Sequence, residues 1–108
     1  MSADAMANAC AVVAAYLERS MVPDPDGAAA YVAENVQIIF TGGRNFSAPA
    51  ETAGFNAKRY NWVKKRVGRM HAAFDAETGD VHVFNVGHLY GAWPDGTAFD
   101  GNRYIDTF

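Results

Sequence analysis

The stretch from Asp80 to Phe108 constrains the fold most strongly. It contains two strand-like runs, Asp80 to Ala92 and Ala98 to Phe108, on either side of one turn. That turn contains Asp95-Gly96, a dipeptide that favours a tight β-hairpin. Both runs also carry polar side chains at positions where a plain core would hold apolar ones. We therefore expect this hairpin to line a pocket.

The length and composition predict one globular domain over residues 1–108. Half of the residues are hydrophobic, 13% are aromatic and 19% are charged, with a mean hydropathy of -0.13. This balance excludes a disordered chain. It also leaves apolar side chains for a cavity or a subunit interface in addition to the core.

The net charge of -3 argues against a nucleic-acid or acidic-membrane partner, because such binders usually carry a basic balance. Most of the basic residues nevertheless gather in one segment, and no nucleic-acid-binding motif accompanies them. We interpret the cluster as a solvated helix face. Its members are Lys58, Arg59, Lys64, Lys65, Arg66 and Arg69.

The single cysteine, Cys10, excludes an intrachain disulfide and suggests a small buried hydrophobe. Asp4 stands where a signal peptide would be basic, and Glu18 and Arg19 interrupt the first apolar run. No run approaches the roughly 20 apolar residues of a membrane helix. We expect an unprocessed cytoplasmic protein.

Two short helices are predicted near the start. Apolar residues at three- and four-residue spacings indicate a helix from about Ala5 to Ser20, which Pro23 and Pro25 end. Asp26 is a candidate N-cap for a second helix through Glu34.

The middle of the chain predicts a strand, a loop and a third helix. Val36–Thr41 is β-branched and apolar, and Gly42-Gly43 permits a sharp change of direction. Arg44–Glu51 is predicted as a loop and Glu51–Arg66 as a helix. We expect this helix to direct Lys58, Lys64 and Lys65 to solvent and to pack with Phe55, Arg59, Trp62 and Arg66.

A hairpin at Ala76–Gly79 joins a strand from about Arg69 to Asp75 with the strand that begins at Asp80. Side chains alternate between the two faces of a sheet. The face predicted for the core carries Met70, Ala72, Phe74, Val81, Val83, Asn85, Gly87 and Leu89. The opposite face mixes polar and apolar groups, as subunit interfaces do; it carries Arg69, His71, Asp75, His82, Phe84, Val86, His88 and Tyr90.

The register of the last strand has two alternatives. A two-residue Asp95-Gly96 loop places Asn102, Tyr104, Asp106 and Phe108 on the core face, whereas a loop one residue different places Arg103 and Ile105 there. We favour the first alternative because the rings of Tyr104 and Phe108 are then buried.

The element order resembles the SnoaL-like branch of the nuclear transport factor 2 (NTF2) superfamily. The resemblance rests on AAYLERS, on MVPDPDGAAAYVAENVQIIFTGGRNF and on YGAWPDGTAFDGNRYIDTF, and it covers essentially the whole chain. It implies an α+β cone in which three helices pack on a curved antiparallel sheet. It also implies an apolar cavity and a homodimer formed through the outer sheet face. Members usually continue through a further strand, so we expect this domain to lack its last strand.

The resemblance leaves three functions open, since a shared fold does not select among them. The leading expectation is a protein that binds a small, mainly apolar molecule in an internal cavity. The first alternative is a cofactor-free isomerase, cyclase or dehydratase with an aspartate base. The second is a dimeric interaction module without a ligand, working through the face of His82, Phe84 and His88.

Asp106 is the candidate base, because an inward carboxylate loses hydration. Tyr16, by the resemblance, and Tyr104 are candidate donors to an oxyanion. Each has a structural alternative: an exposed or backbone-bonded carboxylate, and packed rings with satisfied hydroxyls. The base of steroid isomerases falls near Phe40 or Thr41, which cannot accept a proton, so that reaction is not expected unless Asp106 substitutes.

The candidate ligand contacts are mostly apolar. The buried amide of Asn85 needs a partner, and Asp106 is the expected neighbour. Arg44 is placed at the cavity mouth, where it could meet an anion, although a surface arginine is the alternative. The set is Asn85, Phe40, Phe55, Trp62 and Arg44.

We expect no cofactor and no metal. His71 and His88, which invite comparison with dehydratases, fall on the outer face. His82 and His88 are about 20 Å apart on one extended strand, and Cys10 has no partner at ligand spacing.

Overall fold

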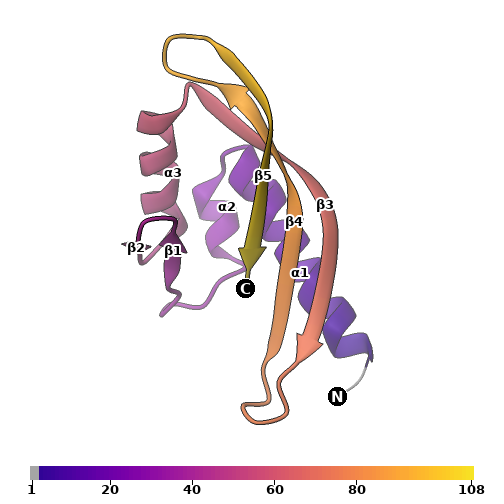
Figure 1. Ribbon diagram of the computed structural model, residues 1–108. Helices are drawn as coiled ribbons and strands as arrows, with labels where there is room; N and C mark the ends of the chain where they lie inside the picture. The colour runs from indigo at the N-terminus through magenta and orange to yellow at the C-terminus, as the bar shows by residue number, and fades with distance from the viewer. Residues whose placement is uncertain (1–2) are drawn as a thin grey trace.

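The computed structural model describes residues 3–108 and contains a small hairpin and a larger three-stranded sheet with helices on one side (Figure 1). Both sheets are antiparallel. In chain order the elements are α1 (Ala3–Met21), α2 (Pro25–Ala29), β1 (Ile38–Phe40), β2 (Arg44–Phe46), α3 (Pro49–Arg59), β3 (Trp62–Phe74), β4 (Val81–Ala92) and β5 (Ala98–Thr107).

The first helix is confirmed, whereas the second differs at both ends from its prediction. The side chain of Asp24, and not that of Asp26, caps α2 by accepting from the Gly27 amide at 3.0 Å. The helix ends at Ala29 because the next amides bond to carbonyls three residues back, which makes isolated turns. Within residues 3–108, no helix combines the length and apolar character needed to cross a bilayer.

The predicted third helix is wrong beyond Arg59. Helix α3 begins at Pro49, and Tyr60 leaves it with extended dihedrals of φ -125° and ψ 153°. The Asn61 amide then bonds to the Ala92 carbonyl, and Trp62 starts β3. Aromatic and β-branched residues favour strands, and here that preference outweighs the helical spacing. Trp62 and Arg66 therefore do not share a helical stripe with Phe55.

The first predicted strand is shorter than expected and belongs to a hairpin. Strand β1 pairs with β2, which occupies part of the predicted loop Arg44–Glu51. Gly42 and Gly43 turn the chain between them with φ values of 88° and 75°. The rings of Phe40 and Phe46 both contact Phe55 of α3, with centroid distances of 5.7 and 5.5 Å.

The core lies between α1 and one face of the larger sheet. Val13 and Leu17 of α1 pack with Val83 of β4, and all three are almost completely buried. Met70 pairs with Asn85 and Ala72 with Val83, as predicted. The inner face of the sheet is therefore the predicted one.

A β-bulge interrupts β3. Val67 pairs with Gly87 and Met70 with Asn85, so Gly68 and Arg69 together oppose one residue of β4. A Cβ at Gly68 would lie 2.3 Å from the Val86 carbonyl oxygen, which explains the glycine. Between Trp62 and the bulge, the alternation of β3 side chains between the two faces is the reverse of that between Met70 and Phe74. Lys65 pairs with Leu89 and lies on the inner face, contrary to the predicted solvent-facing position.

The favoured register of β5 is confirmed, although the predicted two-residue loop is wrong. The Trp93 amide bonds to the Thr97 carbonyl at 2.9 Å, which closes a three-residue loop. A second irregularity follows, where Gly101 has a φ of 91°, and it offsets the longer loop. Leu89 therefore pairs with Asn102, as a two-residue loop would also give.

The residues after Gly101 occupy the faces predicted for them. Tyr104 lies opposite Gly87 and Asp106 opposite Asn85, while the side chain of Ile105 is 69% exposed on the other face. The Phe108 ring packs on Tyr16, with 6.1 Å between centroids, but it is 41% exposed and not buried as expected.

Replacement of Gly68 by alanine should destabilise the protein by about 1–3 kcal/mol, because the added methyl group meets the Val86 carbonyl. The matched control is Gly54→Ala. Gly54 lies in α3, and apart from the adjacent residues and backbone of the helix itself no atom lies within 4 Å of the place that a methyl group would take, so alanine should stabilise the helix by roughly 0.5–1 kcal/mol. Urea unfolding measures both free energies. Equal effects of the two substitutions would contradict the bulge assignment.

Candidate functional site

Three of the predicted site residues lie on the inner face of the sheet, and a fourth, Tyr16, lies on α1, which packs against that face. Asp106 and Asn85 are directly opposite each other on β5 and β4. Tyr104 is two residues from Asp106 and lies over Gly87, where a Cβ would be 2.7 Å from the tyrosine oxygen. The negative charge of Asp106 acts on the hydroxyls of both Tyr104 and Tyr16. The structure thus brings Asp106, Tyr104, Tyr16 and Asn85 into one group.

The amide of Asn85 is fully buried, and both its oxygen and its nitrogen have a hydrogen-bond partner within the protein. Its Oδ1 accepts a hydrogen bond from the Tyr104 hydroxyl at 2.6 Å. Its Nδ2 donates to the carbonyl of Arg69 at 3.0 Å, and Arg69 is one of the two bulge residues left outside the strand pairing. The partner expected for the amide was Asp106. The observed partners give Asn85 a structural task, which is to hold the bulge and to orient Tyr104.

Lys65 is the site residue that the sequence prediction missed. Its ammonium group forms an ion pair with the Asp106 carboxylate and lies 4.6 Å from the centroid of the Tyr104 ring. The two charged side chains are 26% and 32% exposed, so both reach the surface of the inner face. The available signal was Gly68, because a glycine inside a strand often marks a bulge that changes which side chains face inward.

The two tyrosines remain neutral hydrogen-bonding groups. Burial, reinforced by the charge of Asp106, raises the pKa of Tyr104 to about 12. Burial also raises the pKa of Tyr16, against an opposing effect of the Ser20 side chain and with a smaller contribution from Asp106. The group therefore combines one cation, one anion and two phenols, which can orient and polarise an oxygen-bearing ligand.

Three other predicted ligand contacts form a second group. Arg44 lies over the ring of Phe55, with its guanidinium carbon 5.4 Å from the centroid, and Phe40 packs on the same ring. Nη1 of Arg44 donates to the Thr41 carbonyl at 2.8 Å. Arg59 also approaches Phe55, at 5.9 Å. This group belongs to α3 and the β1–β2 hairpin.

Trp62 joins neither group. It is 45% exposed, and its ring contacts Tyr90 with 5.7 Å between centroids. The guanidinium of Arg66 lies over the Tyr90 ring and forms an ion pair with Asp100. Trp62 consequently lies apart from Phe55, with which it was predicted to anchor a helix.

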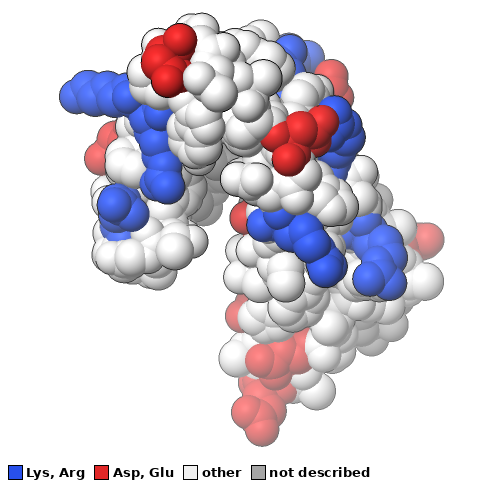
Figure 2. All heavy atoms as spheres, turned by 45° about the horizontal axis from the view of Figure 1, so that its top comes forward, with Lys and Arg blue, Asp and Glu red and all other residues white. Residues whose placement is uncertain are grey.

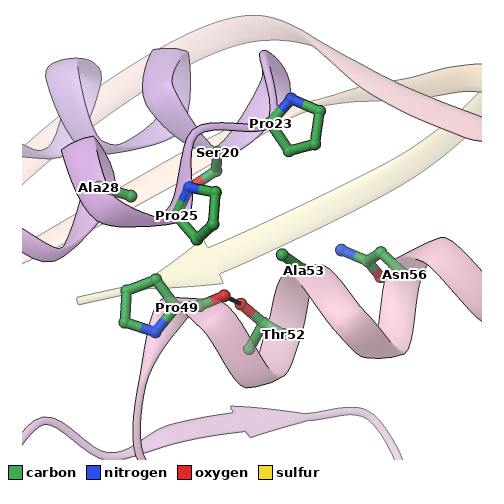
Figure 3. A pocket seen from close by; sticks show the side chains of 8 residues that line it. All are labelled: Ser20, Pro23, Pro25, Ala28, Pro49, Thr52, Ala53 and Asn56. Atoms are coloured by element: carbon green, nitrogen blue, oxygen red, sulfur yellow. Dashed lines mark hydrogen bonds between the residues drawn. The ribbon is translucent and has the colours of Figure 1, made fainter.

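The molecule is hollowed between two arms, and lysine and arginine side chains lie on both (Figure 2). A small pocket of about 30 Å³ lies where the end of α1 meets α2 and α3. Prolines form much of its wall, and Thr52 donates to the Pro49 carbonyl beside it (Figure 3). This volume holds about one water molecule, whereas drug-sized ligands occupy roughly 300–1,000 Å³. The expected ligand-sized cavity therefore stays a prediction.

Within residues 3–108, no group of three histidine, cysteine or acidic side chains lies close enough to hold a metal ion. His71 and His88 are exposed and pair, respectively, with Phe84 and Arg103 in the strand register. They lie on the outer face, as predicted.

Comparison with known proteins identifies the architecture. No protein-family model and no curated protein sequence matches the chain. Among solved structures, Aln2 from a Streptomyces species superposes with a TM-score of 0.72 at 17% identity, covering 99% of this chain and 81% of Aln2. The chain has the SnoaL-like, NTF2-like fold.

Two further structures with this SnoaL-like fold support the assignment. A candidate polyketide cyclase from Xanthomonas campestris pv. campestris has a TM-score of 0.62 at 18% identity, over 95% of this chain and 81% of its own. A candidate scytalone dehydratase from Novosphingobium aromaticivorans has a TM-score of 0.60 at 13% identity, over 90% and 79%. The predicted resemblance and the α+β class are confirmed, and identities this low carry the fold alone.

Tyr104 should make the protein lose stability in strong alkali. Its pKa rises from 10.0 to about 12 on folding, so the folded state holds this proton more tightly. The contribution of Tyr104 to the free energy of unfolding is complete below pH 10 and is lost as the pH rises through about 12. Urea unfolding between pH 9 and pH 12 should show a smaller decline for Tyr104→Phe than for the unmodified protein. The control is Tyr31→Phe at an exposed ring, which should leave the slope unchanged.

Proposed function

We propose that this protein binds a small, mainly apolar molecule between the inner face of β3–β4–β5 and the helices. The observation that carries the proposal is the group of Lys65, Asp106, Tyr104 and Tyr16 at the edge of an apolar surface. Apolar walls supply affinity for such a ligand, and a few polar groups fix its orientation.

The chemistry of the polar group supports a ligand that carries oxygen. A lysine ammonium and tyrosine hydroxyls donate to carbonyl or hydroxyl oxygens. The proteins with similar structures include two candidate polyketide cyclases and a candidate scytalone dehydratase. Because one fold hosts many activities, these names support a ligand class only together with the residues of this chain.

The second candidate function is cofactor-free proton transfer with Asp106 as the base. The specific observation in its favour is that the carboxylate lies beside a cation and close to two neutral phenols. In this reaction the carboxylate removes a proton from the carbon next to a carbonyl group. The electron pair moves to the oxygen and gives an enolate, and the protonated Asp106 returns the proton. Tyr16 is the phenol proposed to contact that oxygen, because Tyr104 donates to Asn85.

We also propose a homodimer formed through the outer face of the sheet. Ile105 and Phe84 are exposed there, at 69% and 38%, and Val86 lies opposite Ile105. A second copy would remove these side chains from water, which favours association by about 25 cal/mol per Å² of apolar surface. The same face could instead hold a different protein, as in an interaction module that uses His82, Phe84 and His88.

Binding and catalysis can be separated with Asp106→Asn. Fluorescence titration with 2-naphthol, a rigid apolar phenol, should show saturable binding, and the variant should keep an affinity within about threefold. If the protein is an enzyme, it should accelerate deuterium incorporation next to the carbonyl of α-tetralone in D₂O, and the variant should lose that acceleration.

The control for this comparison is Asp26→Asn, which makes the same charge change at an exposed position on α2. It should alter neither measurement. Absence of saturable 2-naphthol binding to the unmodified protein would overturn the binding proposal. Exchange that persists in Asp106→Asn would show that this carboxylate is not the base.

The dimer predicts a specific response to charge on the outer face. Sedimentation velocity at micromolar concentration should show a dimer, and Ile105→Lys should shift it to monomer. Ile39→Lys introduces the same charge on β1, where the side chain is 61% exposed, and should leave the dimer intact. A monomer for the unmodified protein would exclude this interface.

A further inference from the structure

We propose that Lys65 forms an oxyanion subsite, and that the ligand carries an acidic oxygen, as in a phenol, an enol or a 1,3-dicarbonyl compound. This inference rests on the proposed binding function and makes its ligand class more specific. It also gives a role to a residue that the sequence pattern assigned to solvent.

The first argument is the position of the ammonium group. It pairs with Asp106, lies over the Tyr104 ring at 4.6 Å and remains 26% exposed at the side chain. An ammonium group has three N–H donors, and the ion pair with one carboxylate oxygen uses one of them. The others are available to a ligand that lies against the same surface.

The second argument is the engagement of Tyr104. Its hydroxyl proton is committed to Asn85 Oδ1 at 2.6 Å, inside a fully buried amide network. Redirecting that proton to a ligand would leave the Asn85 oxygen without a partner, at a cost of about 1–3 kcal/mol. Lys65 donates without this cost, and a charged donor makes a hydrogen bond roughly twice as strong as a neutral one.

The third argument is the distribution of the neighbouring cations. Lys64 pairs with Tyr90 in the strand register and so faces the outer side, where Arg66 forms an ion pair with Asp100. The one-residue insertion at Gly68 and Arg69 reverses the parity of this part of β3. Without that bulge, Lys65 would occupy the outer face. The bulge therefore delivers one cation of this basic segment to the inner face.

The step balances when an acidic ligand binds. The oxygen–hydrogen bond of the ligand breaks, its proton passes to the solvent, and the ligand oxygen keeps the electron pair. Lys65 remains an ammonium ion and donates an N–H group to that oxygen. Because one proton is released for each ligand bound in this form, affinity for an acidic ligand rises with pH up to the pKa of the free ligand.

The test measures the ionisation of bound 2-naphthol by absorbance across a pH titration. An ammonium ion within about 4–6 Å lowers the pKa of an acidic group by 1–3 units, so the ionisation constant of the bound phenol should rise at least tenfold over that in water. Lys65→Met should abolish the rise, and Lys65→Arg should retain it. Lys64→Met, a matched loss of charge on the opposite face, should also retain it.

A second measurement uses the unmodified protein alone. Affinity for 2-naphthol should strengthen as the pH rises toward the pKa of the phenol, while affinity for 2-methoxynaphthalene, which cannot ionise, should stay constant. Parallel pH dependences for the two probes, or an unaltered ionisation constant in Lys65→Met, would overturn the role of Lys65 while leaving the binding function standing. Failure of both probes to bind would overturn the binding function and this inference with it.

Discussion

The side-chain amide of Asn85 is the contact on which the inner face depends. It satisfies the Arg69 carbonyl at the bulge of β3 and the Tyr104 hydroxyl of β5, and so joins all three strands of the larger sheet through one buried group. A buried amide without partners would cost about 1–3 kcal/mol, so bulge and tyrosine orientation are fixed together. The bulge sets the parity of β3 and therefore decides that Lys65 meets Asp106. A local irregularity of the backbone thus determines the chemistry of the surface.

The last two strands could be predicted from the sequence because their alternation is strong. The inner face of β4 and the inward position of Asp106 follow from that pattern. The start of β3 could not be predicted, since residues 51–66 also show helical spacing, and only pairing with β4 decides between the two periods. The β4–β5 register was right through two deviations that offset each other. The loop is one residue longer than expected, and the irregularity at Gly101 absorbs the extra residue.

The candidate site was predicted in part for the same reason. Its members on β4 and β5 followed from alternation, and Tyr16 followed from a family resemblance. Lys65 was missed for two reasons. The predicted helix was continued too far, and the bulge in β3 was not anticipated. Phe40, Phe55 and Arg44 were expected together and do lie together, but they form a second group on α3 and the small hairpin. Local hydrophobic pattern places residues on elements, whereas tertiary pairing decides which groups meet.

The ion pair between Lys65 and Asp106 contributes little to the stability of the sheet. Pairs in contact with water are typically worth roughly 0–1 kcal/mol, and an apolar pair of similar size would hold the strands at least as well. The adjoining core is already apolar, since it contains Val83, Met70 and Leu17, and an apolar pair in place of Lys65 and Asp106 would extend it. Two opposite charges at the border of that core, with two neutral phenols beside them, are therefore not required for packing, and we propose that they act on an oxygen atom of a ligand. This difference between what the fold requires and what the inner face contains is the physical reason for assigning chemistry to this face of the sheet.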